Sequence, residues 1–129
     1  MLSLLRIVTG VVFFMAGTQK LFGYPPFPAQ LPSMTPTPMW EFYVAGYLEV
    51  FLGGAFVLGF LTRAVSFVLA GEMAVAYFQV SFPLGFWPNT NWGVTAVLHC
   101  FIFLYFMFAG AGPWSIDSVI ARSKRGGTA

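Results

Sequence analysis

The sequence predicts an all-α integral membrane protein, an antiparallel bundle of four transmembrane helices with both termini on the cytoplasmic side. Three observations lead to this fold class. Of the 129 residues, 58% are hydrophobic and only 8% are charged, whereas a soluble domain carries roughly a quarter charged residues. Four stretches are apolar enough to cross a bilayer, which takes about 20 residues. The cations also gather on one side of these stretches.

The predicted spans follow one another with little between them, in a single domain that covers the whole chain. They are residues 4–22, 40–61, 64–82 and 93–109. Residues 23–39 hold six prolines and no charge, so we expect an extended loop laid over the helix ends. Thr62 and Arg63 join the second and third spans, which makes them an antiparallel hairpin.

A short interfacial helix is predicted after the last span, over residues 115–122. Ser115 can cap its start, and Asp117 suits its first turn. Ile116, Val119 and Ile120 recur at helical spacing and can face lipid.

The distribution of cations sets the expected orientation. With four spans, the two termini and the second connection share one side of the membrane, which carries Arg6, Arg63 and the basic tail at residues 122–125. The other side carries only Lys20. Because cytoplasmic loops are rich in Lys and Arg, the richer side is predicted to be cytoplasmic, in a cell membrane. The basic tail is thereby explained, and a net charge of +2 gives no reason to expect nucleic acid.

Ionisable groups inside spans are the candidate functional residues, since a water-free bilayer makes them costly. Three lie deep in their spans, namely Glu49, Glu72 and His99, and Lys20 lies near the non-cytoplasmic end of the first. Glu49 shares a helix face with two glycines and has a potential partner in His99. All three deep groups can point into the bundle.

Each of these candidate residues also has a purely structural explanation. A buried glutamic acid can be protonated and hydrogen-bonded to a neighbouring helix, and a lone histidine is more often structural than a ligand. Cys100 is expected to pack as a small apolar side chain. The sequence has no metal-ligand pattern, no GxSxG motif and no phosphate-binding glycine loop. We therefore expect no metal and no cofactor held by the chain itself, but a bound quinone or lipid is compatible with it.

Several short motifs in order resemble the DoxX family of membrane proteins. They are Gly17–Gly23 (GTQKLFG), Glu49-x-x-x-Gly53-Gly54 with Thr62-Arg63, the Gly85-Phe86-Trp87 loop, Asn91-x-Gly93 and the closing GAGPWSID at residues 110–117. The resemblance implies a four-helix bundle in a family that includes membrane subunits of a thiosulfate:quinone oxidoreductase. It makes Lys20, Glu49, Arg63 and Glu72 the polar positions of interest. This chain has Val94 where the family pattern has an acid.

Two functions follow as hypotheses. In the first, the chain is a quinone-linked redox subunit that is not catalytic alone. Its candidate quinone contacts are Lys20, Glu49 and His99, and its candidate catalytic residues are Glu49, His99 and Glu72. In the second, it is a non-catalytic accessory subunit docked on a larger respiratory or photosynthetic membrane complex. Both expect other protein subunits as partners. A small-molecule transporter ranks third, because no inverted repeat or broken span is visible.

Overall fold

The computed structural model describes residues 1–26 and 38–127, and within them every regular element is helical. The elements are α1 (Leu2–Phe22), α2 (Met39–Leu58), α3 (Thr62–Ala76), α4 (Val94–Ala109) and α5 (Ile116–Gly126). A π-helical turn, η1 (Tyr77–Ser81), and a 3-10 turn, η2 (Phe82–Leu84), extend α3. The loop predicted over residues 23–39 falls mostly on residues 27–37, outside the described residues.

A glycine ends α2 earlier than the hydropathy pattern predicts. The second span is predicted to reach residue 61, but α2 ends at Leu58 because Gly59 turns to φ 71°. The N–H of Phe60 then donates to the Ala55 carbonyl oxygen at 2.9 Å. α3 consequently starts at Thr62, two residues before the predicted start, and with η1 and η2 it runs to Leu84. Apolar composition does not register such turns, since Phe60 and Leu61 are themselves apolar.

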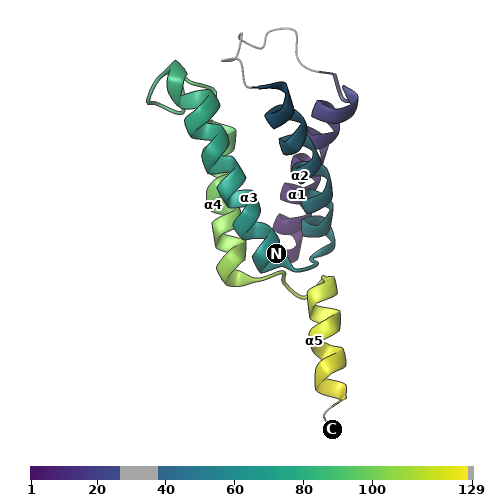
Figure 1. Ribbon diagram of the computed structural model, residues 1–129. Coiled ribbons are helices and arrows are strands. Elements are labelled where there is room, and N and C mark those ends of the chain that lie inside the picture. Colours follow the sequence, from purple (N-terminus) through teal and green to yellow (C-terminus); the bar gives the residue numbers. More distant parts are fainter. Residues whose placement is uncertain (27–37, 128–129) are drawn as a thin grey trace.

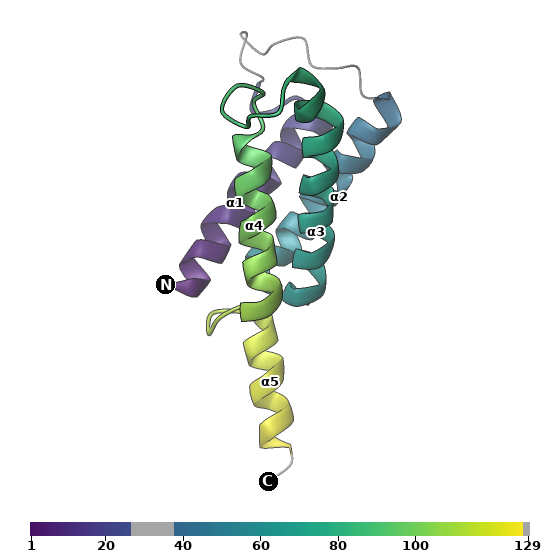
Figure 2. The same ribbon diagram turned by 90° about the vertical axis from the view of Figure 1, so that its left-hand side faces the viewer.

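The helices form two antiparallel pairs, α1 with α2 and α3 with α4 (Figure 1). One end of the bundle, here called the terminal end, carries residues 1–3, 59–62 and 110–115. The opposite end, called the loop end, carries residues 23–26 and 84–93 (Figures 1 and 2).

A cluster of aromatic rings joins the two pairs. Phe56 of α2 meets Phe103 and Phe106 of α4 edge-to-face, each at a ring-centroid distance of 5.1 Å. Phe13 of α1 meets Phe103 in the same way at 5.0 Å. All four rings are buried, together with Leu69 of α3. Edge-to-face contacts of this kind add to the area they bury, so this cluster is the core that fixes the arrangement of the helices.

The outside of the bundle is apolar. Three segments have the length and hydropathy of a membrane span, Leu2–Phe22, Met39–Leu58 and Thr62–Leu84. α4 is apolar but shorter, with 16 residues. Large side chains such as Phe51, Phe101 and Phe108 are exposed around the bundle, as expected for contact with lipid. The chain is thus a helical membrane protein with several apolar helices.

α5 begins where predicted but extends to Gly126, and it points away from the bundle (Figures 1 and 2). Ser115 caps it, accepting a hydrogen bond from the Ser118 N–H at 3.1 Å. None of its residues is buried. In this structure the helix therefore continues along the direction of the bundle and does not lie across its end.

Candidate functional site

Close approach of α1 and α2 brings the first two candidate residues together. A Cβ atom added at Gly17 would lie 2.8 Å from the Glu49 Cβ and 2.8 Å from the Val50 nitrogen. One added at Gly46 would lie 3.2 Å from the Lys20 Cβ. Glycine at both positions lets the two backbones approach closely. On α1, Arg6, Gly10, Phe13 and Gly17 recur at intervals of three or four residues, and all four are buried.

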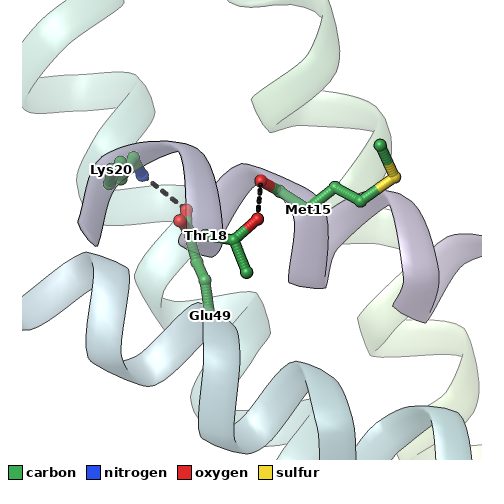
Figure 3. A network of polar contacts seen from close by, with 4 residues as sticks. All are labelled: Met15, Thr18, Lys20 and Glu49. Carbon is green, nitrogen blue, oxygen red and sulfur yellow. Dashed lines mark hydrogen bonds and ion pairs between the residues drawn. The ribbon is translucent and has the colours of Figure 1, made fainter. Parts of the chain in front are cut away.

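Lys20 and Glu49 form an ion pair between these helices (Figure 3). The Lys20 Nζ lies 2.5 Å from the Glu49 Oε1, and the two side chains are 25% and 3% exposed, respectively. Glu49 thus points into the bundle, as predicted. Thr18, near Lys20 in Figure 3, donates to the Met15 carbonyl oxygen at 2.9 Å and takes no part in the pair.

Glu72 of α3 adds a second carboxylate to this region. Its side chain is close enough to Glu49 and Lys20 to interact with both electrostatically. Both Glu72 carboxylate oxygens are buried without a hydrogen-bond partner, and so is the Glu49 Oε2. The group formed by Lys20, Glu49 and Glu72, here called the acidic cluster, has one cation for two acids. With all three ionised it carries a charge of −1, which a proton would neutralise and a ligand that donates hydrogen bonds would stabilise.

His99 lies elsewhere and does not pair with Glu49. Its Nδ1 lies 2.8 Å from the Thr95 carbonyl oxygen, and its ring packs against Phe13 and Phe103 at centroid distances of 5.8 and 6.0 Å. Because a carbonyl only accepts, Nδ1 carries the proton and Nε2 is left as an acceptor. Neighbouring Cys100 packs against the buried core, as expected, and its thiol donates to the Ala70 carbonyl oxygen at 3.5 Å.

Comparison with known proteins places these residues in a family. The family model for DoxX matches residues 1–81. The chain belongs to the DoxX family. A protein of Haemophilus influenzae, described as uncharacterized, is 36% identical over 120 residues, which cover 91% of this chain and 88% of that protein. No solved structure matches the chain.

The matched DoxX residues include all three members of the acidic cluster. His99 and the motifs at residues 85–93 and 110–117, on which the resemblance also rests, lie beyond the matched range.

At the terminal end, hydrogen bonds to Arg6 and Ser3 hold the closing motif at residues 110–117. Arg6 is 1% exposed. Its guanidinium donates to the carbonyl oxygens of Ala111, Val57 and Trp114, the last at 2.6 Å. The Ser3 hydroxyl also accepts from the Trp114 N–H at 3.1 Å. Arg6 therefore ties α1 to α2 and to the segment before α5, which the sequence reading, treating it as an orientation signal, did not foresee.

Asp117 completes this junction. Its carboxylate accepts hydrogen bonds from the N–H groups of Leu61 and Thr62 at 2.8 and 2.9 Å, which caps α3 from a distant part of the chain. Its own N–H donates to the Gly59 carbonyl oxygen at 2.9 Å. Sequence reasoning placed Asp117 in the first turn of its own helix, and no local signal points to a cap on α3.

At the loop end, Asn91 has a corresponding structural role. The side chain is fully buried. Its amide donates to the Gly85 carbonyl oxygen at 2.7 Å, and its Oδ1 accepts from the Gly93 N–H at 2.8 Å. The Tyr77 hydroxyl donates to the Phe86 carbonyl oxygen at 2.7 Å. Hydrogen bonds that hold loops thus account for the polar side chains at both ends. Among the described residues, three of the six buried side-chain N and O atoms without a hydrogen-bond partner belong to the acidic cluster, and the other three are Arg6 Nε, Thr62 Oγ1 and Ser66 Oγ.

Proposed function

We propose that this DoxX protein crosses the cell membrane four times with both termini in the cytoplasm and serves as the membrane subunit of a quinone-linked oxidoreductase. The observation that carries the redox assignment is the acidic cluster. A donor and three unpartnered carboxylate oxygens stand together inside an apolar bundle. For α4 to cross the membrane as well, the residues that flank it must also lie in the bilayer. Its 16 residues span only about 24 Å, whereas the hydrocarbon core is roughly 30 Å thick.

The acidic cluster has the donors and acceptors that a quinone head group needs. A bound quinone would supply two-electron, two-proton chemistry. The Lys20 Nζ can donate to a carbonyl oxygen of the ligand, and the Glu49 Oε2 can accept from a hydroxyl once the ligand is reduced. Glu72 can hold the second proton. The apolar faces around these groups suit a ring and an isoprenoid tail.

His99 takes a secondary place in this proposal. With Nδ1 donating to Thr95, its Nε2 can only accept unless the ring is protonated. Such a group suits a hydroxyl of the reduced ligand better than a carbonyl of the oxidised one. In this proposal the electrons come from a partner subunit. Residues 1–26 and 38–127 hold no group of three His, Cys, Asp or Glu residues that could bind a metal ion.

The test is turnover with purified complex in lipid, comparing Glu49→Gln with Glu41→Gln as the matched control. Glu41 lies in the first turn of the same helix, outside the acidic cluster. We expect quinone-dependent turnover to be lost in Glu49→Gln and kept in Glu41→Gln, with both bundles assembled. Full turnover in Glu49→Gln would refute the redox assignment.

A second function is favoured by α5, which has apolar and basic side chains and buries none of them. A helix left uncovered in this way suits an accessory subunit docked on a larger respiratory or photosynthetic membrane complex. Gentle extraction from native membranes and native mass spectrometry separate the two functions. A bound quinone in a small assembly with a redox enzyme supports the first. Fixed stoichiometry within a large pigment- or haem-bearing complex, without quinone on this subunit, supports the second.

A further inference from the structure

A pocket of about 540 Å³ opens at the terminal end, away from the acidic cluster. It lies where α3 begins, α4 ends and α5 begins, so three segments far apart in sequence line it. Arg63 and Ala64 come from α3, Ala109 from α4, and Asp117 and Ser118 from α5. Neither proposed function uses this pocket.

Arg63 brings a positive charge to the pocket and forms no ion pair with a described carboxylate. The one acid in the lining is Asp117, whose oxygens accept hydrogen bonds from the backbone of Leu61 and Thr62 and whose charge interacts with the Arg6 guanidinium. The ion pairs among residues 1–26 and 38–127 do not include Arg63. Its guanidinium lies over the chain at Gly110, where an added Cβ would stand 3.6 Å from Nε and 3.7 Å from Nη2.

A second cation continues the same surface. Arg122 follows Ser118 by four residues in α5, so the two share a face of that helix. Ser118 lines the pocket. Arg122 therefore extends the positive charge from the pocket along α5.

Apolar side chains flank the pocket on the side of the bundle. Leu61 lines it and is 57% exposed, and Phe67, one turn after Arg63 on α3, is 66% exposed. A ligand that fits this site has an anionic group for Arg63 and a hydrocarbon part for the flank. A free inorganic anion would leave the apolar flank unused.

We propose that this pocket binds the phosphate of an anionic glycerophospholipid, with Arg63 as its principal donor and Arg122 in support. Guanidinium groups bind phosphate oxygens in a bidentate manner, and basic pockets at helix ends are where membrane proteins hold anionic lipids. The acyl chains lie along Leu61 and Phe67. A lipid held there covers the junction where α3, α4 and α5 meet, and this binding is independent of the redox chemistry.

The experiment is native mass spectrometry of the purified full chain in detergent with added phosphatidylglycerol or phosphatidylcholine. We expect the wild type to retain phosphatidylglycerol preferentially and Arg63→Gln to lose about tenfold in affinity, the equivalent of one charge-assisted hydrogen bond. Lys124→Gln is the matched control, since it removes the same charge from α5 but Lys124 does not line the pocket. Equal losses in both variants, or no loss in Arg63→Gln, would overturn the proposal.

Two further measurements keep the test independent of the folding of Arg63→Gln. Ala64→Leu keeps the charge and narrows the pocket, so we expect it to weaken retention of phosphatidylglycerol; unchanged retention would show that the lipid binds elsewhere. Inorganic phosphate is not expected to displace the lipid. Displacement at millimolar phosphate would instead assign the pocket to free anions.

Discussion

Replacing the two partners of the Lys20–Glu49 ion pair separately should destabilise the bundle to different extents. Lys20→Met leaves the Glu49 carboxylate, which is 3% exposed, without its cation. Glu49→Gln leaves Lys20, which is 25% exposed and sits in the last turn of α1, where a long side chain can reach the interface. The loss of stability should therefore be greater when the more deeply buried residue, Glu49, is left without its partner.

The magnitudes follow from this difference in burial. Removing one member of a buried pair costs about 3–5 kcal/mol. Taking up a proton at pH 7 would cost an ordinary glutamate about 4 kcal/mol, which sets an upper limit to the loss in Lys20→Met. We expect about 3 kcal/mol for Lys20→Met and about 1 kcal/mol for Glu49→Gln, since Lys20 stays hydrated. The double variant Lys20→Met/Glu49→Gln should lie within about 1 kcal/mol of the wild type, because it buries no charge.

The assay is reversible unfolding in mixed micelles, with free energies compared in a double-mutant cycle. A coupling energy near zero, or a greater loss in Glu49→Gln than in Lys20→Met, would refute the reasoning. The same variants report on function, because a double variant that is stable but inactive separates a redox role of the acidic cluster from a structural one.

Three other substitutions probe how the bundle is held. Gly17→Ala should destabilise the bundle by about 1–3 kcal/mol, because the added Cβ meets the α2 backbone. The control is Gly71→Ala, where an added Cβ has nothing within 4 Å. In the same unfolding assay it should be neutral or stabilising. Asn91→Ala should make the loop at residues 84–93 sensitive to protease, because it leaves the Gly93 N–H and the Gly85 carbonyl unpaired. Asn89 is exposed, so Asn89→Ala should not have this effect. Equal cleavage of both variants would contradict the prediction. Arg6→Gln should lower the midpoint of thermal unfolding and speed hydrogen exchange in α5, since three carbonyls lose their donor; unchanged exchange would show that Arg6 does not hold the junction.

The helices could be predicted from sequence because hydropathy and length act locally. Apolar runs broken by glycine and proline located α1 to α4 to within a few residues, and Ser115 located the start of α5. On α1, the spacing of three and four residues likewise places Arg6 and Gly17 on one face, and that face is buried. Glu49 was recognised as an inward-facing acid for the same reason, since one helix face carries it together with Gly46 and Gly53.

The pairing of residues between helices required the tertiary structure. From sequence, Glu49 had His99 as its candidate partner, but the close crossing at Gly17 gives it Lys20 instead. Asp117 and Leu61 are 56 positions apart, and Arg6 and Ala111 are 105 apart. Their hydrogen bonds depend on how whole helices stack, which no local pattern encodes.

Composition and periodicity act locally, and they predict that this protein is helical, is apolar enough for a membrane and has few ionisable groups inside its spans. Which of those groups meet depends on the packing of the helices. The tertiary structure assigned Arg6, Asp117 and Asn91 to holding the two ends of the bundle, and left Lys20, Glu49 and Glu72 together with unpaired oxygens. The physical reason is that burial and hydrogen bonding of a side chain depend on its neighbours in space, and the packing of helices sets those neighbours.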